Sequence, residues 1–428
     1  MHQPRKLKAG ALLSVVGIAT IMALLLGLML LLLRYNRNET SLLLRRLKLE
    51  RNLESGTALL LSQVYAEKAS EEELIDLFKE ETDSISLQHY PWGLYEIAII
   101  KSFEGIDTLK KVFLKGNAIQ NDKAYALYLK DDDRPLSISG KSVVRGTAYL
   151  PPAGIRKAYI EDKAYEGDTT VYGDIKNSEK KLPALNTALV EQIKLLNYDS
   201  LKNRSDSVLS FYALKDSVNR SFYQKPLILS SEDSISLENL SLKGAVVVVS
   251  KRAIYLPSSA QIEHAIFIAP KIKIAKDFKG TLQAFAQDSI LVEENVELPY
   301  PSALGLIERR TENSVQEFTP EIAIHKDAKI HGVVFSVAAT SATDFMNRIR
   351  MEPGSEIHGE VYADGMLELK GSVFGSVTCQ RFVLQTPSSL YDNFLLDAVI
   401  DYTKRSRHYL ESALLQTAGK GGIVKWLH

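Results

Sequence analysis

The hydrophobic pattern begins with an uninterrupted apolar segment. No charged residue occurs over residues 9–33, a run of 25 positions. At about 1.5 Å of rise per residue, a helix of this length exceeds the ~30 Å hydrocarbon core of a bilayer. The apolar core of a signal peptide is typically about 7–15 residues long and is followed by small residues at a cleavage site. Here Leu33 runs directly into Arg34, so the pattern predicts a transmembrane helix.

The apolar pattern then changes to an amphipathic one. Leucine or valine recurs at spacings of seven and four on a single helical face, at Leu42, Leu49, Leu53, Leu60 and Val64. Charged residues fill much of the rest of this segment, which predicts that the helix continues with one face packed against another element. We therefore expect one stem helix within residues 1–68.

The stem resembles the N-terminal helix of type IV pilins and pseudopilins. The resemblance rests on its two-part pattern and on residues 6–13, KLKAGALL, where basic residues and a glycine precede the hydrophobic segment. It implies a candidate processing junction between Gly10 and Ala11. Val15 departs from the family, since most major pilins carry a glutamate five residues into the mature chain.

Basic residues flank the apolar segment on both sides. Arg5, Lys6 and Lys8 precede it, and five more lie between Arg34 and Lys48. The positive-inside rule alone therefore favours a cytoplasmic body. A short basic tail is easily retained in the cytoplasm, however, and the pilin resemblance implies export. We expect a single-pass protein of the cytoplasmic (inner) membrane with its body on the extracytoplasmic side.

A small α+β meander is predicted over residues 70–138. Ser70 and Glu73 have capping-box spacing, which predicts a short helix with an apolar face at Leu74, Leu77 and Phe78. Strand-like runs follow at residues 92–103, 111–115 and 124–130, separated by turn-forming residues.

An internal repeat predicts a parallel β-helix over residues 139–387. An aliphatic residue or alanine lies on either side of x-Gly-x at five places, centred on Gly146, Gly173, Gly332, Gly359 and Gly375. In such a solenoid the aliphatic residues stack inward and glycine lets the chain turn a corner. We expect these glycines to be structural, without a ligand role, and the β-helix to be one cooperative body. Helical spacing at Leu189, Ile193, Leu196 and Leu201 predicts a helical insertion over about residues 185–241.

Part of this body resembles the bactofilins, a polymer-forming family built as a compact parallel β-helix. The resemblance rests on residues 354–361 (GSEIHGEV), 364–369 (DGMLEL) and 371–377 (GSVFGSV). Residues 388–428 are extra, and we expect them to cap the solenoid and prevent open-ended stacking. The predicted fold class is mainly β: a long transmembrane helix and an antiparallel meander, followed by a parallel β-helix.

Composition narrows the function. Lys plus Arg and Asp plus Glu both number 52, so no polyanion such as nucleic acid is expected as a partner. The single cysteine, Cys379, excludes an intramolecular disulfide and lies in an apolar run where burial is expected. No nucleotide, dinucleotide, zincin or serine-hydrolase motif occurs. We therefore expect no enzyme activity and no cofactor or metal.

Two alternatives stay open at this point. His331 and His358 occupy the same slot of two repeats, so stacked imidazoles sharing a metal compete with the interpretation that both are solvated. Glu293, Glu294 and Asp364 are the carboxylates available to a β-helix enzyme, although adjacent residues of a strand point to opposite faces. A solvated turn is favoured over a cation site for residues 131–133.

The sequence favours a membrane-anchored extracytoplasmic structural or interaction protein, a pseudopilin-like component of a cell-envelope assembly. Its expected partners are the lipid bilayer and other proteins of that assembly. The alternative is a membrane-anchored β-helix enzyme that acts on cell-surface carbohydrate.

Overall fold

The structure is a computed structural model. It describes residues 10–62, 72–79, 83–118, 124–202, 208–214, 217–307, 319–338, 347–415 and 420–427. The chain divides into two compact units. The stem unit comprises residues 1–59, 72–87 and 100–110, and the β-helix unit comprises residues 60–71, 88–99 and 111–428.

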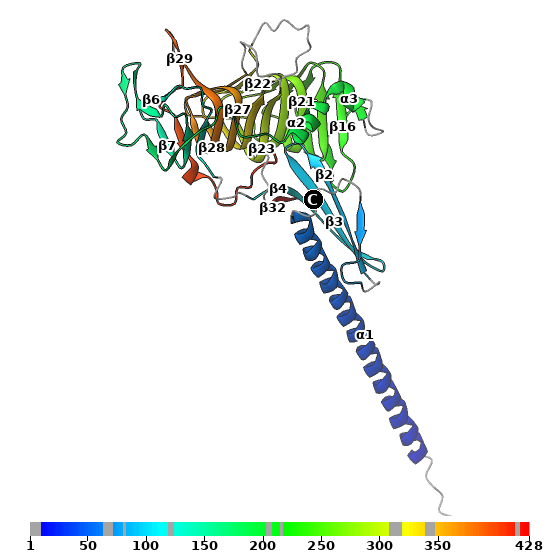
Figure 1. Cartoon of the computed structure of the whole chain (residues 1–428). Coiled ribbons are helices and arrows are strands. Elements are labelled where there is room, and N and C mark those ends of the chain that lie inside the picture. The colour runs from blue at the N-terminus through cyan, green and yellow to red at the C-terminus, as the bar shows by residue number, and fades with distance from the viewer. Residues whose placement is uncertain are drawn as a thin grey trace, which may run out of the picture. The chain divides into compact units, whose positions relative to one another are not determined.

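The stem unit begins with one unbroken helix, α1 (Gly10–Leu61) (Figure 1). It is the one helix in the described part of the chain that is long and apolar enough to cross a membrane. Its apolar half is exposed along its length, from Leu13 at 79% to Leu33 at 54%. The hydroxyls of Ser14 and Thr20 donate to carbonyls four residues earlier, so these polar groups are satisfied inside the helix.

The second half of α1 packs against antiparallel strands of the same unit. Leu49 and Leu53 are buried, and a Cβ at Gly56 would lie 3.0 to 3.2 Å from side chains of Ile85, Leu87 and Ile100. Arg45 Nη1 lies 2.8 Å from Asp107 Oδ2. The predicted amphipathic face is therefore confirmed from Leu49 onward.

Two details of the stem prediction need correction or lie outside the described residues. Leu42 is 58% exposed because it lies about one helical turn before Arg45, the residue that contacts Glu104 and Asp107 at the tip of an antiparallel hairpin. Val64 lies outside the described residues.

The antiparallel sheet has the order β1-β2-β3-β4-β32, with bounds Glu73–Ile75, Asp83–Trp92, Tyr95–Glu104, Asp107–Asn117 and Gly421–Leu427.

The short helix predicted after Ser70 is wrong where the structure describes it. Residues 73–75 form β1, and Glu73, Leu74 and Ile75 pair antiparallel with residues 85–87 of β2. Strand pairing outweighs the capping-box signal there, because local propensity is a weak prior against tertiary contacts. Ser70 itself lies outside the described residues.

The β-helix unit is built from long parallel strands that stack in register (Figure 1). Ile330, Ile357 and Val373 pair in register on three neighbouring strands of the stack, are fully buried and stack inward. The predicted fold class, mainly β with a long apolar helix, an antiparallel sheet and a parallel β-helix, is thus confirmed. The successive strands are β21 (Gln261–Ile274), β22 (Gly280–Val292), β23 (Glu297–Ile307), β24 (Glu321–Ile324), β25 (Lys329–Val337), β26 (Arg348–Met351), β27 (Glu356–Leu369) and β28 (Ser372–Gln385).

The early strands stack on the last of these long strands. β28 pairs in parallel with β5, which pairs with β8 and, through it, β13. β28 also pairs with β31, which pairs with β7 and, through it, β12. The bounds are β5 (Leu127–Leu129), β7 (Val143–Arg145), β8 (Ala148–Leu150), β12 (Val171–Tyr172), β13 (Ile175–Asn177) and β31 (Val399–Asp401).

The other end of the β-helix is formed from the middle of the chain. There β14 pairs with β16, and β16 with β19, while β15 pairs with β18. The bounds are β14 (Val208–Ser210), β15 (Val218–Arg220), β16 (Leu227–Ser231), β17 (Ile235–Ser236), β18 (Ser241–Gly244), β19 (Val246–Ser250) and β20 (Ala253–Leu256).

Two short helices lie between these groups of strands in the sequence. α2 (Thr187–Leu195) and α3 (Tyr198–Lys202) confirm the predicted helical spacing, and Asn186 caps α2 by accepting from Leu189 N. The predicted insertion over residues 185–241 is too long, because rungs begin again at Val208. The helical segment lies on the path that takes the chain from one end of the solenoid to the other.

The C-terminal residues do not form the predicted cap. β31 lies inside the stack between β28 and β7, and β32 pairs antiparallel with β4. A tail that supplies a rung cannot also close the end of the solenoid. The remaining elements are β6 (Leu136–Ser139), β9 (Ile155–Lys157), β10 (Tyr159–Ile160), β11 (Lys163–Ala164), η3 (Phe211–Ala213), β29 (Leu390–Asp392), β30 (Phe394–Leu396) and η4 (Tyr402–Lys404).

Candidate functional site

The predicted rung glycines lie at positions of the β-helix where an added side chain would crowd neighbouring atoms. Gly332, Gly359 and Gly375 pair in register on β25, β27 and β28. At Gly359, φ is +149°, and a Cβ would overlap the carbonyl oxygen of Gly332. The same overlap with a neighbouring rung holds at Gly375 and Gly173, while Gly146 has φ +116°. These positions therefore require glycine for packing reasons, and their lack of a ligand role stays a prediction.

The candidate processing junction lies where the described chain begins. Gly10 is the first residue of α1, and both Gly10 and Ala11 are exposed. A Cβ at Gly10 would meet nothing within 4 Å. Cleavage between them stays a prediction.

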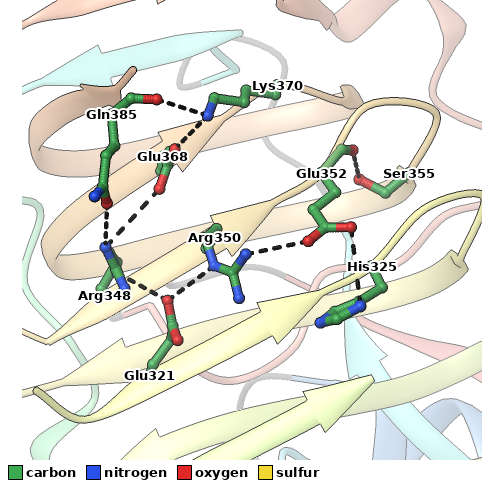
Figure 2. Close-up of polar contacts among 9 residues, drawn as sticks. All are labelled: Glu321, His325, Arg348, Arg350, Glu352, Ser355, Glu368, Lys370 and Gln385. Carbon is green, nitrogen blue, oxygen red and sulfur yellow. Dashed lines mark hydrogen bonds and ion pairs between the residues drawn. The ribbon is translucent and has the colours of Figure 1, made fainter. Parts of the chain in front are cut away.

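One outer face of the β-helix carries a cluster of carboxylates, shown in Figure 2. On β24, Glu321 Oε1 forms an ion pair with Arg348 Nε of β26 at 2.8 Å and accepts a hydrogen bond from Arg350 Nε of the same strand at 3.1 Å. Glu368 on β27 is almost fully buried, and its Oε1 lies 2.7 Å from Lys370 Nζ. Each carboxylate of this cluster forms an ion pair with a basic side chain. This is the arrangement of a structural ion-pair network.

The ion-pair network continues along the neighbouring rung. Glu352 Oε1 lies 3.1 Å from Arg350 Nη1, and Glu352 Oε2 lies 3.9 Å from His325 Nδ1 (Figure 2). Arg348 Nη1 is 3.9 Å from Glu368 Oε2. These contacts tie β24, β26 and β27 together from outside the core.

The carboxylates named from the sequence do not converge. Glu293 Oε1 lies 2.8 Å from Lys273 Nζ, and Glu294 Oε2 lies 2.8 Å from Lys276 Nζ. Asp364 accepts hydrogen bonds from the Gln380 side chain and from Ala338 N. Residues 131–133 form a turn in which Asp131 Oδ1 accepts from Asp133 N at 2.9 Å. Cys379 is buried as predicted, and burial raises the pKa of its thiol.

His331 and His358 are brought together as the shared slot predicted. Their rings stack with centroids 4.4 Å apart and an interplanar angle of 13°, and Phe374 continues the stack at 4.8 Å from His358. Among the residues that the structure describes, no group of three or more His, Cys, Asp or Glu side chains is placed to hold a metal ion.

The histidines are only partly solvated, so the interpretation of a fully solvated surface position needs correction. Both are half-buried and line a cavity of about 480 Å³, because residues 402–410 form its other side. We call this cavity the basic pocket. Its lining residues are Tyr300, His331, His358, Lys404, Arg405, Ser406, His408, Tyr409 and Val424.

Local hydrogen bonds hold residues 402–410 in place. Asp401 caps η4 by accepting from Thr403 N at 3.0 Å. The hydroxyl of Tyr409, which is buried, lies 3.2 Å from both the Gly332 carbonyl oxygen and Glu360 Oε1. The Tyr300 hydroxyl donates to Leu410 O at 3.0 Å. The segment is therefore fixed against the corner formed by the rung glycines.

A buried acid lies behind the basic pocket. Burial, and next the nearby Glu411 carboxylate, raise the pKa of Glu360 to about 8, although Arg405 opposes this shift. Glu360 is therefore mostly protonated at neutral pH. Burial, and next His358, lower the pKa of His331, so its imidazole is mainly neutral there.

Sequence reasoning missed the residues on the far side of the pocket. Lys404, Arg405, Arg407 and His408 give four basic residues in a run of five. That run is a visible signal of a local positive surface. Its position opposite His331 and His358 depends on the strand order, which the sequence pattern did not predict.

Comparison with known proteins does not assign a family. No protein-family model matches the chain, and no curated protein matches it. Among solved structures, it is similar to the competence-associated pilin ComZ from Thermus thermophilus, with 9% identity and a TM-score of 0.24 over 84% of this chain and 86% of the other. At that TM-score and identity, the similarity assigns neither a fold nor a function to this chain.

Proposed function

We propose that this chain is a membrane-anchored structural or interaction protein whose body lies on the extracytoplasmic side of the cytoplasmic membrane. The observation that carries the proposal is the exposed apolar half of α1, where the large apolar side chains between Leu12 and Leu33 are 54–79% exposed among the described residues. A contiguous apolar surface of this size is far larger than soluble proteins expose. A bilayer supplies the missing environment.

Within that role, the chain acts as a pseudopilin-like component of a cell-envelope assembly, with other proteins of that assembly as partners. Two features support this finer proposal. The apolar helix continues without a break into an amphipathic half, and in the stem unit that half packs on antiparallel strands. The residues around Gly10 also have the pattern of a pilin processing junction.

A non-catalytic role is part of the proposal. The clustered carboxylates of Figure 2 are ion-paired to Arg and Lys, and a general acid–base pair needs carboxylates free to exchange protons with a substrate. Near-zero net charge supports partners other than nucleic acid.

Topology reporters test the anchoring and orientation together. A C-terminal fusion to a reporter that is active only outside the cytoplasm should be active and should stay in the membrane fraction after alkaline extraction. The same fusion lacking residues 1–33 should be inactive and soluble. Activity of a cytoplasm-only reporter on the full chain would contradict the proposed orientation.

Mass measurement tests the pseudopilin-like part separately. If a prepilin-type peptidase acts on this chain, the mature protein starts at Ala11, and its intact mass lacks residues 1–10. An intact mass that includes those residues, measured on membrane-extracted protein from the native host, would reject processing while leaving the anchor in place.

A further inference from the structure

We propose that the basic pocket binds a small organic anion through a phosphoryl or carboxylate group. The pocket lies in the β-helix unit, between the stacked His331 and His358 on one side and residues 404–409 on the other. This binding site goes beyond the structural role proposed above and does not depend on which side of the membrane the body occupies.

The charge of the lining argues for an anion. No Asp or Glu is among the described residues that line the pocket, whereas Lys404, Arg405 and His408 all do. The whole chain carries equal numbers of acidic and basic residues, so this local excess is not a consequence of composition. Clefts lined by one sign of charge concentrate ligands of the opposite sign.

Lys404 is available to a ligand. Its Nζ lies 5.1 Å from the centroid of the Phe374 ring, and it forms no ion pair with the residues that the structure describes. A lysine ammonium held over an aromatic ring beside a cavity keeps its donors free for an anionic oxygen.

Arg405 supplies a second, more deeply placed positive charge. Its side chain is only 5% exposed, and Nη1 lies 3.5 Å from Glu411 Oε1. That nitrogen nevertheless makes no hydrogen bond. Because this nitrogen is itself shielded from the cavity and the other terminal nitrogen, Nη2, donates to the Tyr402 hydroxyl, Arg405 contributes positive charge behind the lining, while Lys404 supplies the accessible cationic donor.

The remaining donors are neutral. Ser406 contributes a hydroxyl and His331 an imidazole to the lining, whereas His358 Nε2 is already 3.0 Å from Glu356 Oε2. Charged groups on one side and neutral donors on the other suit a ligand with one anionic group and a polar body.

The volume of the pocket suits a small molecule better than a bare ion. At about 480 Å³, the pocket falls within the range of about 300–1,000 Å³ that is usual for small-molecule sites. Tyr300 and Tyr409, with ring centroids 5.3 Å apart, provide aromatic surface for the uncharged part of the ligand. The ligand we infer is therefore of monosaccharide size and carries one phosphoryl or carboxylate group.

Calorimetric titration of the full chain in detergent micelles tests this inference. The probes are glucose 6-phosphate, glucuronate, glucose and inorganic phosphate, so that the anionic group and the ring are varied separately. Glucose 6-phosphate or glucuronate should bind, and glucose should bind at least about tenfold more weakly, as loss of a charge-assisted contact implies. Equal binding of glucose and its phosphate, or no binding of either anion, would overturn the proposal.

Substitutions then place the binding in this pocket. Lys404→Gln should weaken binding of the anion about tenfold. The matched control is Lys243→Gln, which removes an exposed lysine on β18 that does not line the pocket. Thermal unfolding of both variants checks that the fold is kept, as expected for exposed side chains. Equal affinity in the two variants would show that the anion binds elsewhere and would overturn the assignment.

Discussion

Gly359 has no room for a side chain. Its φ is +149°, and a Cβ would overlap the Gly332 carbonyl oxygen and lie 2.8 Å from the Tyr409 hydroxyl. Gly359→Val should therefore lower the free energy of unfolding by at least about 1–3 kcal/mol. His358→Ala removes a neighbouring, partly exposed ring and should cost only about 0.5–1 kcal/mol. Urea unfolding of the two variants gives the comparison, and an equal loss would contradict the assigned corner geometry.

Glu360 makes stability depend on pH. Its pKa is raised from 4.5 to about 8, first by burial and then by Glu411. Between these two values the folded state keeps a proton that the unfolded state has lost. The stabilisation is therefore fully present below about pH 4.5 and is lost as the pH rises towards about 8.

Glu360→Gln tests this dependence because glutamine stays neutral at every pH. The free energy of unfolding of the variant should change less between pH 5 and pH 8 than that of the wild type. Glu238→Gln, at an exposed position, should keep the wild-type slope. Urea denaturation at several pH values measures the slopes, and identical slopes for wild type and Glu360→Gln would exclude Glu360 as the source.

At the residue scale, the residues that could be predicted were those that recur in the repeat. Gly332, Gly359 and Gly375 were recognisable because each lies between inward aliphatic residues in a recurring pattern. The residues that face His331 across the pocket were not recognisable. Lys404 and His408 lie more than 70 positions away in the sequence, and no local pattern indicates that they line the same pocket.

The two halves of α1 have different surroundings, and two of its glycines show the difference. A Cβ at Gly56 would crowd Ile85, Leu87 and Ile100, whereas one at Gly27 would meet nothing within 4 Å. Gly56→Leu should therefore weaken packing of the helix on its strands by about 1–3 kcal/mol. Gly27→Leu should leave that packing unchanged.

Hydrogen exchange of amides in residues 49–59 measures the packing of α1 in both variants. Protection should fall in Gly56→Leu and stay at the wild-type value in Gly27→Leu. Unchanged protection in Gly56→Leu would mean that the helix end does not depend on close contact with the strands.

At the element scale, helices and long strands were predicted better than short strands. α2 and the amphipathic half of α1 have strong periodicity, which survives in the structure. β1 was mistaken for a helix because its pairing with β2 is a tertiary effect. The rungs after Val208 were included in an insertion because their strands are only two to five residues long, too short for alternation to stand out.

At the scale of the molecule, one hydrophobic core connects both ends of the β-helix. It includes Ala126 and Val171 from the early rungs, Val248 from the middle and Ile400 from the C-terminal segment. A continuous core of this kind favours unfolding as one body, although solenoids can also open rung by rung.

Ile400→Ala distinguishes these two behaviours. Ile400 is fully buried and pairs with Val373 on one side and Val144 on the other. The truncation should cost about 2–5 kcal/mol. In a cooperative body, hydrogen-exchange protection should fall equally at Val144 and at the distant Val248. A loss confined to β7, β28 and β31 would show that the rungs open independently.

The strand order also means that the β-helix can be completed only late in the synthesis of the chain. Leu127 on β5 pairs with Val377 on β28, a partner 250 positions later in the chain. Translation at about 5–20 residues per second delays that partner by roughly 10–50 s. Over this time the early strands have exposed edges, which are prone to pair with other chains. Until the last rungs emerge, residues 124–177 are therefore the part of the newly made chain most exposed to pairing with another chain.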